Sequence, residues 1–295
     1  MEKKWWTLVV VCAATFMLLL DITIVIVALP TIQSELHANF SEVQWVIDAY
    51  ALTLASVLLA AGSLADRYGQ RLLFSIGLVV FTVGSLLCGI SQSSIMLILS
   101  RSAQGIGGAM LFATSLSLLA HCFHGKERGM AFGVWGAVTG VAAGLGPVLG
   151  GLITSAITWR GIFLVNLPVG VAALVVTRWR VDEYKTPHAS RPDWGGFVTL
   201  TAGLSSLVYG LIRAGELAWS DTGVEICLAL AAVFFAAFVA LEQRVDHPLF
   251  DLALFRIPTF SGGLAAAFAL NGSLYAMFLY LTLYLQDDLG HSAVA

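Results

Sequence analysis

A carboxylate interrupts one of the most apolar stretches of the sequence. Residues 18–30 read LLLDITIVIVALP, and Asp21 stands in the middle of this run. If the run crosses a membrane, a charge at that depth costs about 2.5–3.5 kcal/mol on insertion scales, so Asp21 is a functional candidate by default. A carboxylate in such surroundings can bind and release a proton, or it can hold a cation.

Two more charged residues, Asp48 and Arg101, also fall inside apolar stretches. A helix rises about 1.5 Å per residue, which places both at a depth similar to that of Asp21. A guanidinium beside a carboxylate lowers the cost of burying either group, and Gln104 adds a polar neighbour to Arg101. Two alternatives stay open: Asp48 lies near a helix end and could reach the interface, and Arg101 could be a structural clamp.

Composition places these residues in a membrane protein. The chain has 295 residues, of which 58% are hydrophobic and 11% are charged. Soluble domains are about one-quarter charged, and a chain this apolar cannot cover a surface that faces water. There is no basic patch for nucleic acid, no ATP-binding or hydrolase motif, and no cysteine spacing that suggests a metal or a disulfide framework. We therefore expect no enzyme activity and no cofactor.

The apolar stretches are long enough to be transmembrane helices. A bilayer core about 30 Å thick needs about 20 helical residues, and no alternating strand pattern suggests a barrel. The sequence therefore predicts an all-α membrane protein, with nine spans at 7–29, 44–65, 72–91, 95–119, 129–153, 160–179, 195–214, 223–242 and 259–286.

Basic residues indicate the orientation of these spans. Cytoplasmic segments carry an excess of Lys and Arg. With the N-terminus inside, twelve of the fifteen basic residues are cytoplasmic: Lys3, Lys4, Arg67, Arg71, Lys126, Arg128, Arg178, Arg180, Lys185, Arg191, Arg244 and Arg256. We therefore predict a multi-pass protein with a cytoplasmic N-terminus.

A glycine-containing turn joins the second and third predicted spans. Its sequence is GSLADRYGQR, with Gly62, Asp66, Arg67, Gly69 and Arg71. We expect about six residues between the two spans. In this interpretation Gly62 permits a close approach of two helices, and Gly69 supplies the permissive backbone of the turn. The charged residues would then lie together at the cytoplasmic face.

A stripe of glycines follows one face of the fifth predicted span. Gly136, Gly140 and Gly144 recur every four residues, which lets another helix backbone approach closely. We expect Pro147 to kink this helix. Other glycines in the same motif are Gly146, Gly150 and Gly151.

Several of these stretches, in this order, resemble the motifs of the major facilitator superfamily, in particular its drug:proton antiporters with fourteen helices. The similar stretches include LDITIVIVALP, GSLADRYGQR, RSAQGIGGA, GVAAGLGPVLGG and WRGIFLVNLP. Further similar stretches are DWGG and HPLFDLALFRIPTF, so the resemblance covers nearly the whole chain. Two positions depart from the family pattern: Ile26 replaces a usual Asn, and Gly161 replaces an aromatic residue.

The resemblance implies a domain organisation. Residues 1–180 would form the N-terminal six-helix bundle, 181–258 a cytoplasmic linker and an additional two-helix hairpin, and 259–295 the first helix of a second bundle. Alternating access requires two bundles, so the chain is expected to be a fragment of a longer transporter.

The resemblance also implies a function, which is export of amphipathic, often cationic small molecules across the cell (inner) membrane, driven by a proton gradient. Asp21, assisted by Asp48, would bind the proton or the cation, and Arg101 with Gln104 would tune that site. Asp66, Arg67 and Arg71 would form a cytoplasmic latch between the second helix and the opposing bundle, and the Gly140–Gly144 stripe of the fifth span would seal the antiporter.

Two rival functions stay open at this point. The protein could export a metabolite or a siderophore, since the sequence does not discriminate between substrate classes. Alternatively, it could be a truncated membrane protein that folds or associates with a partner but does not transport.

Overall fold

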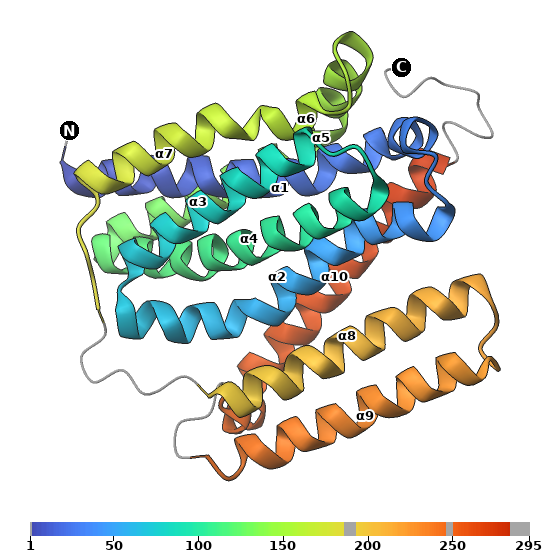
Figure 1. The fold of residues 1–295 in the computed structure, drawn as a ribbon. Coiled ribbons are helices and arrows are strands. Elements are labelled where there is room, and N and C mark those ends of the chain that lie inside the picture. Colours follow the sequence, from blue (N-terminus) through green and yellow to red (C-terminus); the bar gives the residue numbers. More distant parts are fainter. Residues whose placement is uncertain (1, 186–192, 246–249, 284–295) are drawn as a thin grey trace.

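The computed structural model describes residues 2–185, 193–245 and 250–283, and every regular element in them is helical. Figure 1 shows the arrangement. This confirms the predicted all-α class. The elements are α1 (Lys3–Leu36), α2 (Phe40–Tyr68), α3 (Gln70–Gly89), α4 (Ser94–Cys122), α5 (Gly125–Ala156), α6 (Gly161–Leu164), α7 (Asn166–Arg180), α8 (Trp194–Glu216), α9 (Thr222–Glu242), the 3₁₀ helix η1 (Leu252–Arg256) and α10 (Pro258–Leu283).

Local sequence signals fix where several helices begin and end. At the start of α2, the Asn39 side chain accepts a hydrogen bond from the Glu42 backbone, and the Glu42 carboxylate accepts one from the Asn39 backbone. This reciprocal capping box satisfies backbone N–H groups that a helix terminus leaves without partners. The preceding helix, α1, ends at His37, whose backbone is left-handed with a φ of 51°.

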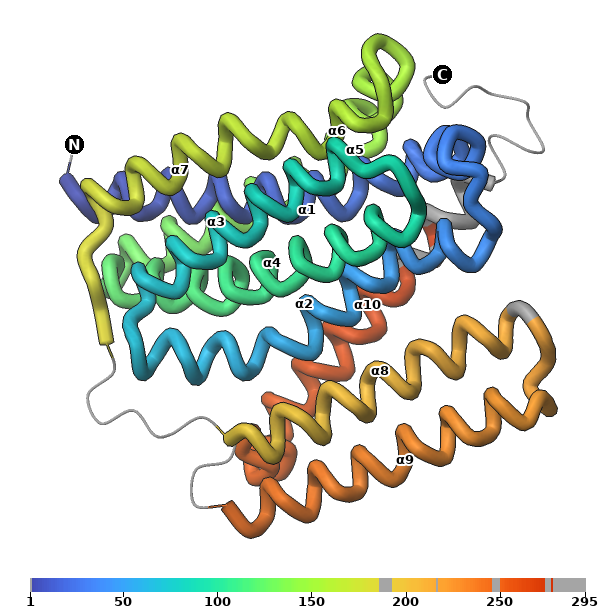
Figure 2. The backbone as a smooth tube through the Cα atoms, viewed as in Figure 1, coloured from blue at the N-terminus to red at the C-terminus, as the bar shows by residue number. Residues whose placement is uncertain are grey.

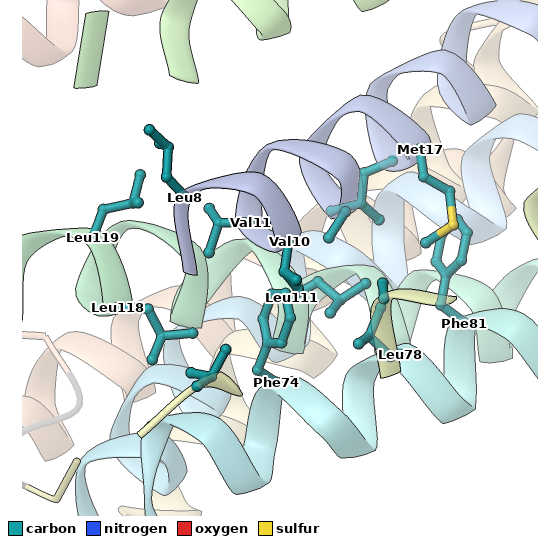
Figure 3. Packing of buried hydrophobic residues seen from close by; sticks show 14 of the residues in the cluster. Leu8, Val10, Val11, Met17, Phe74, Leu78, Phe81, Leu111, Leu118 and Leu119 are labelled. Carbon is teal, nitrogen blue, oxygen red and sulfur yellow. The ribbon is translucent and has the colours of Figure 1, made fainter. Parts of the chain in front are cut away.

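Helices α1 to α7 pack into one bundle. In its interior α4 contacts α1, α2 and α3, while α1 also packs against α5 and α7. Figure 3 shows the apolar interior where α1, α3 and α4 meet. Its buried side chains include Val10, Val11, Met17, Phe74, Leu78, Phe81, Leu111 and Leu118. This packing fixes the rotation of each helix about its axis, and therefore decides which polar side chains face one another.

Helices α8 and α9 form a hairpin beside the bundle, as the tube in Figure 2 shows. The hairpin contacts the bundle through α8 and α2, where the rings of Trp45 and Tyr209 lie 6.1 Å apart. At its tip Arg213 donates a hydrogen bond of 3.0 Å to Asp221. This bond from the guanidinium holds the pKa of the Asp221 carboxyl below its usual range.

Helix α10 contacts η1, which directly precedes it, and its described side chains are mostly exposed. In Figure 1 this helix crosses the view behind α2 and α8. Within the described residues, eight helical segments are long and apolar enough to cross a membrane, with α6 and α7 counted as one.

The structure differs from the predicted spans in three details. The turn between the second and third spans is a single residue, Gly69, because helical structure continues through the polar residues on both sides. The span predicted at 160–179 is interrupted at Val165, between α6 and α7. The first helix extends well beyond 7–29, since a helix can continue past the apolar core of a membrane into polar surroundings.

Candidate functional site

The candidate site is a fully buried ion pair between α1 and α4. The Asp21 and Arg101 side chains are 0% and 1% exposed, and Arg101 Nη1 donates a hydrogen bond to Asp21 Oδ2. The partner expected for Asp21 from the sequence is therefore its actual partner. Together the two charges are neutral, which reduces the cost of placing either of them in the membrane interior.

Arg101 is held from several directions. Its Nε donates to the backbone carbonyl of Val46 on α2 at 3.1 Å, and its Nη1 donates to Gln104 Oε1 at 2.7 Å. The guanidinium carbon lies 4.3 Å from the centre of the Tyr50 ring, within the range of a cation–π interaction. These contacts tie α4 to α2, so Arg101 clamps the bundle in addition to pairing with Asp21.

The second oxygen of the carboxylate has a separate set of partners. Asp21 Oδ1 accepts hydrogen bonds from Gln104 Nε2 at 2.8 Å and from Asn166 Nδ2 at 3.0 Å. The Ser85 hydroxyl lies between the two amides and accepts from Gln104 Nε2 at 2.8 Å and from Asn166 Nδ2 at 3.3 Å. The site therefore combines side chains from α1, α3, α4 and α7.

Asn166 and Ser85 are members of the site that sequence reasoning missed. Asn166 is only 2% exposed and belongs to an apolar stretch, IFLVNLPVG, where a polar amide is itself a signal. Ser85 gives no comparable signal, because many serines occur in the apolar stretches of this chain. The location of Ser85 beside both amides follows from the packing of α3 against α4 and α7.

Asp48 is not part of this cluster. The side chain is half-buried on α2, and no hydrogen bond or ion pair joins it to Asp21 or Arg101 in the described part of the chain. The expectation of two neighbouring acids at one depth is therefore not realised as a contact. Asp48 lies three residues after Trp45, whose ring meets Tyr209 of α8, so this side of α2 faces the hairpin.

The turn between α2 and α3 is bound to the segment that follows α7, residues 181–184, which we call the α7 strap. Glu183 accepts hydrogen bonds from the backbone N–H groups of Arg71 at 2.9 Å and Leu72 at 3.1 Å, and so caps the N-terminus of α3. The Arg71 side chain donates to the carbonyl of Val181 at 3.1 Å. Arg71 thus bonds within its own bundle, although the sequence suggested a latch against another bundle.

Gly69 has two structural reasons to be glycine. Its φ is +124°, a conformation that residues with a Cβ rarely adopt. A Cβ at this position would also lie 2.5 Å from Glu183 Oε1.

The other residues of the turn motif have local contacts. Asp66 accepts a hydrogen bond of 3.0 Å from Gln70, and Arg67 lies over the Tyr68 ring. A Cβ at Gly62 would have no described atom within 4 Å, so the close helix approach expected at this residue is absent from the described residues.

The glycines of α5 divide between two environments. A Cβ at Gly146 would lie 1.8 Å from Thr23 Oγ1, and one at Gly150 would lie 2.8 Å from the carbonyl of Ile24, so α1 packs closely here. Gly151 is also buried. A Cβ at Gly136, Gly140 or Gly144 would meet nothing within 4 Å among the described residues. Within this chain, the close approach is therefore at Gly146 and Gly150, and the predicted stripe faces open space.

The sequence and the fold identify the family of the chain. The model of the Major Facilitator Superfamily matches residues 11–295, and the chain belongs to this family. With eight candidate spans in the described part of the chain, it is an integral, multi-pass membrane protein. Its curated relatives are resistance and export proteins, which makes this a family of transporters and not of enzymes.

Three of these relatives show similar levels of identity. The tetracenomycin C resistance and export protein of Streptomyces glaucescens is 36% identical over 293 residues, which are 99% of this chain and 54% of the relative. The multidrug resistance protein Stp of Mycobacterium tuberculosis is 37% identical over 97% of this chain and 53% of its own. The puromycin resistance protein of Streptomyces alboniger is 37% identical, with 99% and 58% covered.

Solved structures support the fold at lower identity. A peptide transporter crystallised with sulfate has a TM-score of 0.60 and 14% identity, and the match covers 81% of this chain and 52% of that one. A bacterial homologue of the lysosomal transporter Spinster, in an inward-facing conformation, has a TM-score of 0.51 and 19% identity, with 81% and 60% covered. The chain spans about half the length of the curated relatives it matches.

Proposed function

We propose that this protein is a proton-coupled exporter of amphipathic, often cationic small molecules, and that Asp21 is its proton-binding carboxylate. The observation that carries the proposal is the fully buried Asp21–Arg101 pair between α1 and α4. The resistance and export functions named for the relatives support the substrate class.

The ion pair gives a physical basis for coupling. A proton on Asp21 would neutralise the carboxylate and leave Arg101 as an unpaired charge in the interior. Removing one partner of a buried pair costs about 3–5 kcal/mol, a penalty that favours a different arrangement of the helices around Arg101. Proton binding and a conformational change would therefore occur together, which an antiporter needs. The energy source would be the proton gradient, without a bound cofactor.

Other parts of the chain would have supporting roles. Asp48, a half-buried carboxylate, would attract a cationic substrate on the side of α2 that faces the hairpin. The turn at Gly69 and the α7 strap would stabilise one end of the bundle. The excess of basic residues on that side supports a cytoplasmic N-terminus in the cell (inner) membrane.

Efflux from membrane vesicles tests the proposal. The full-length protein would be assayed with a fluorescent organic cation and an imposed pH gradient. We expect Asp21→Asn to abolish gradient-driven transport, because its amide cannot be ionised. The matched control is Glu35→Gln on the same helix, which removes an equal charge from a half-exposed site paired with Arg160. Gradient-driven transport at the wild-type rate by Asp21→Asn would refute the assignment.

A further inference from the structure

Gln104 and Asn166 donate to one oxygen of the Asp21 carboxylate, Ser85 accepts from both amides, and the other oxygen accepts from Arg101. We propose that Asn166, supported by Ser85, is a positioning residue that directs protonation of Asp21 to Oδ2, the oxygen that accepts from Arg101, so that proton binding weakens the Arg101 contact. This inference rests on the proposed function, because it specifies how the same carboxylate is coupled.

The hydrogen bonds themselves settle the orientation of the Gln104 amide. Gln104 Oε1 accepts from Arg101 Nη1, and an arginine has only donors to offer. The Gln104 NH₂ group must therefore face Asp21 and Ser85, where it donates at 2.8 Å to each. Asn166 Nδ2 donates to the same two acceptors. Each amide nitrogen thus directs its hydrogens to the carboxylate and to the serine.

The two carboxylate oxygens consequently differ. Among the described residues, Oδ1 has two amide donors, whereas Oδ2 has one donor, the Arg101 guanidinium. Each carboxylate oxygen has two lone pairs, so a proton that binds Oδ1 must displace one of the two amide donors. A proton that binds Oδ2 leaves both amides in place and competes with Arg101 at that oxygen. The proton from water then becomes the hydroxyl hydrogen of the acid, Arg101 keeps its own charge, and the cluster changes from neutral to a net charge of +1.

Without the Asn166 amide, this restriction is weaker. The carboxylate could then be protonated on Oδ1 while Oδ2 keeps its contact with Arg101. Such a proton would also neutralise the carboxylate, but Oδ2 would keep the hydrogen bond from Arg101, so the drive for the conformational change would be weaker. The expected defect is a proton leak.

Close helix packing explains why Asn166 reaches the carboxylate. It is the first residue of α7, directly after the interruption at Val165. One turn later a Cβ at Gly170 would lie 2.0 Å from Thr82 Oγ1, so α7 and α3 are in close contact. Ser85 follows Thr82 by three residues on the same face of α3, which places it beside Asn166.

Among the described residues, the titratable groups that face the Asp21–Arg101 pair include the Cys88 thiol on α3 and, beside Arg101, Tyr50 on α2. Within the described part of the chain, no titratable side chain of α5, α6 or α7 makes a hydrogen bond or an ion pair with Asp21. Arg101 is therefore the group whose release accompanies protonation at Oδ2.

The experiment compares coupling in proteoliposomes that contain the full-length protein. Proton leak without substrate and the number of protons moved per fluorescent cation would be measured for Asn166→Ala. We expect the leak to rise about tenfold, the factor that corresponds to the loss of one hydrogen bond to a charged group. Ser85→Ala should increase the leak less, because both amides remain.

Thr177→Ala is the matched control. Thr177 is a buried polar residue of the same helix, and its hydroxyl bonds to the carbonyl of Ala173, away from the cluster. If the leak of Asn166→Ala equals that of Thr177→Ala, or persists when Asp21→Asn is added, the inference is wrong. If Asn166→Ala cannot be purified as a folded protein, the leak of Ser85→Ala is compared with that of Thr177→Ala instead. The inference is overturned if the leak of Ser85→Ala does not exceed that of Thr177→Ala.

Failure of the proposed function gives a different result. In that case Asp21→Asn alone transports with the gradient at the wild-type rate. If Asp21→Asn abolishes gradient-driven transport while Asn166→Ala leaves leak and stoichiometry unchanged, only the positioning role is lost.

Discussion

Replacement of Asp21 by leucine should strongly destabilise the bundle, and the structure sets the magnitude. Arg101 is 1% exposed, so the change leaves a buried guanidinium without its counter-charge. Gln104 and Asn166 also lose an acceptor, although each keeps its hydrogen bond to Ser85. Breaking a buried ion pair costs about 3–5 kcal/mol, and we expect Asp21→Leu to lower the free energy of unfolding by that amount.

The second perturbation removes both charges. In the variant Asp21→Leu with Arg101→Met, no unpaired charge is buried, and methionine keeps much of the volume of the arginine stem. We expect this double variant to be more stable than Asp21→Leu alone. The coupling free energy between the two positions should be about 2 kcal/mol or more, the upper part of the range for residues in direct contact.

The assay is reversible unfolding of the 295-residue chain in mixed micelles, followed by a spectroscopic signal for helix content. Asp48→Leu is the matched control, because this half-buried carboxylate makes no ion pair with a described residue. We expect it to change the free energy of unfolding by less than about 1 kcal/mol. The reasoning is refuted if Asp21→Leu behaves like Asp48→Leu, or if the two single changes add without coupling.

Three further predictions concern the glycines and the α7 strap, and the same unfolding assay tests them. Gly69→Ala should cost about 1–2 kcal/mol, because φ is +124° and Glu183 occupies the space of a Cβ; no loss would contradict the turn geometry. Glu183→Gln should cost about 1 kcal/mol through the weaker cap on α3, whereas Asp182→Asn, at an exposed ion pair, should cost less. Gly146→Ala should cost about 1–3 kcal/mol through overpacking against α1. Gly140→Ala should be neutral or stabilising by up to about 1 kcal/mol. Equal effects of the two changes would disprove the assignment of the two faces of α5.

The ion pair shows how far the sequence could be taken. Two charges of opposite sign at similar depth in apolar helices must each find a partner, so a contact between Asp21 and Arg101 was a sound prediction. Asp48 met the same criterion of depth but lies on another side of its helix. Depth can be counted along the chain, whereas the rotation of one helix relative to the next cannot.

The glycines show the same limit. Their spacing in α5 correctly indicates that small residues share a face, but not which of two faces meets a neighbour. The chain places Gly146 and Gly150 against α1 and leaves Gly140 and Gly144 open. In a helix that is apolar on all sides, hydropathy gives no preferred direction toward the interior.

By itself, the sequence determined that this is an all-α membrane protein, roughly where its helices lie, and that Asp21 and Arg101 are its costly charges. Each of these follows from the transfer of one segment between water and lipid, which local composition describes. Only the tertiary structure decided that Asn166 donates to the Asp21 carboxylate, and that Glu183 caps α3. The two contacts join residues 145 and 112 positions apart, and they depend on the packing that sets helix rotation and close approach.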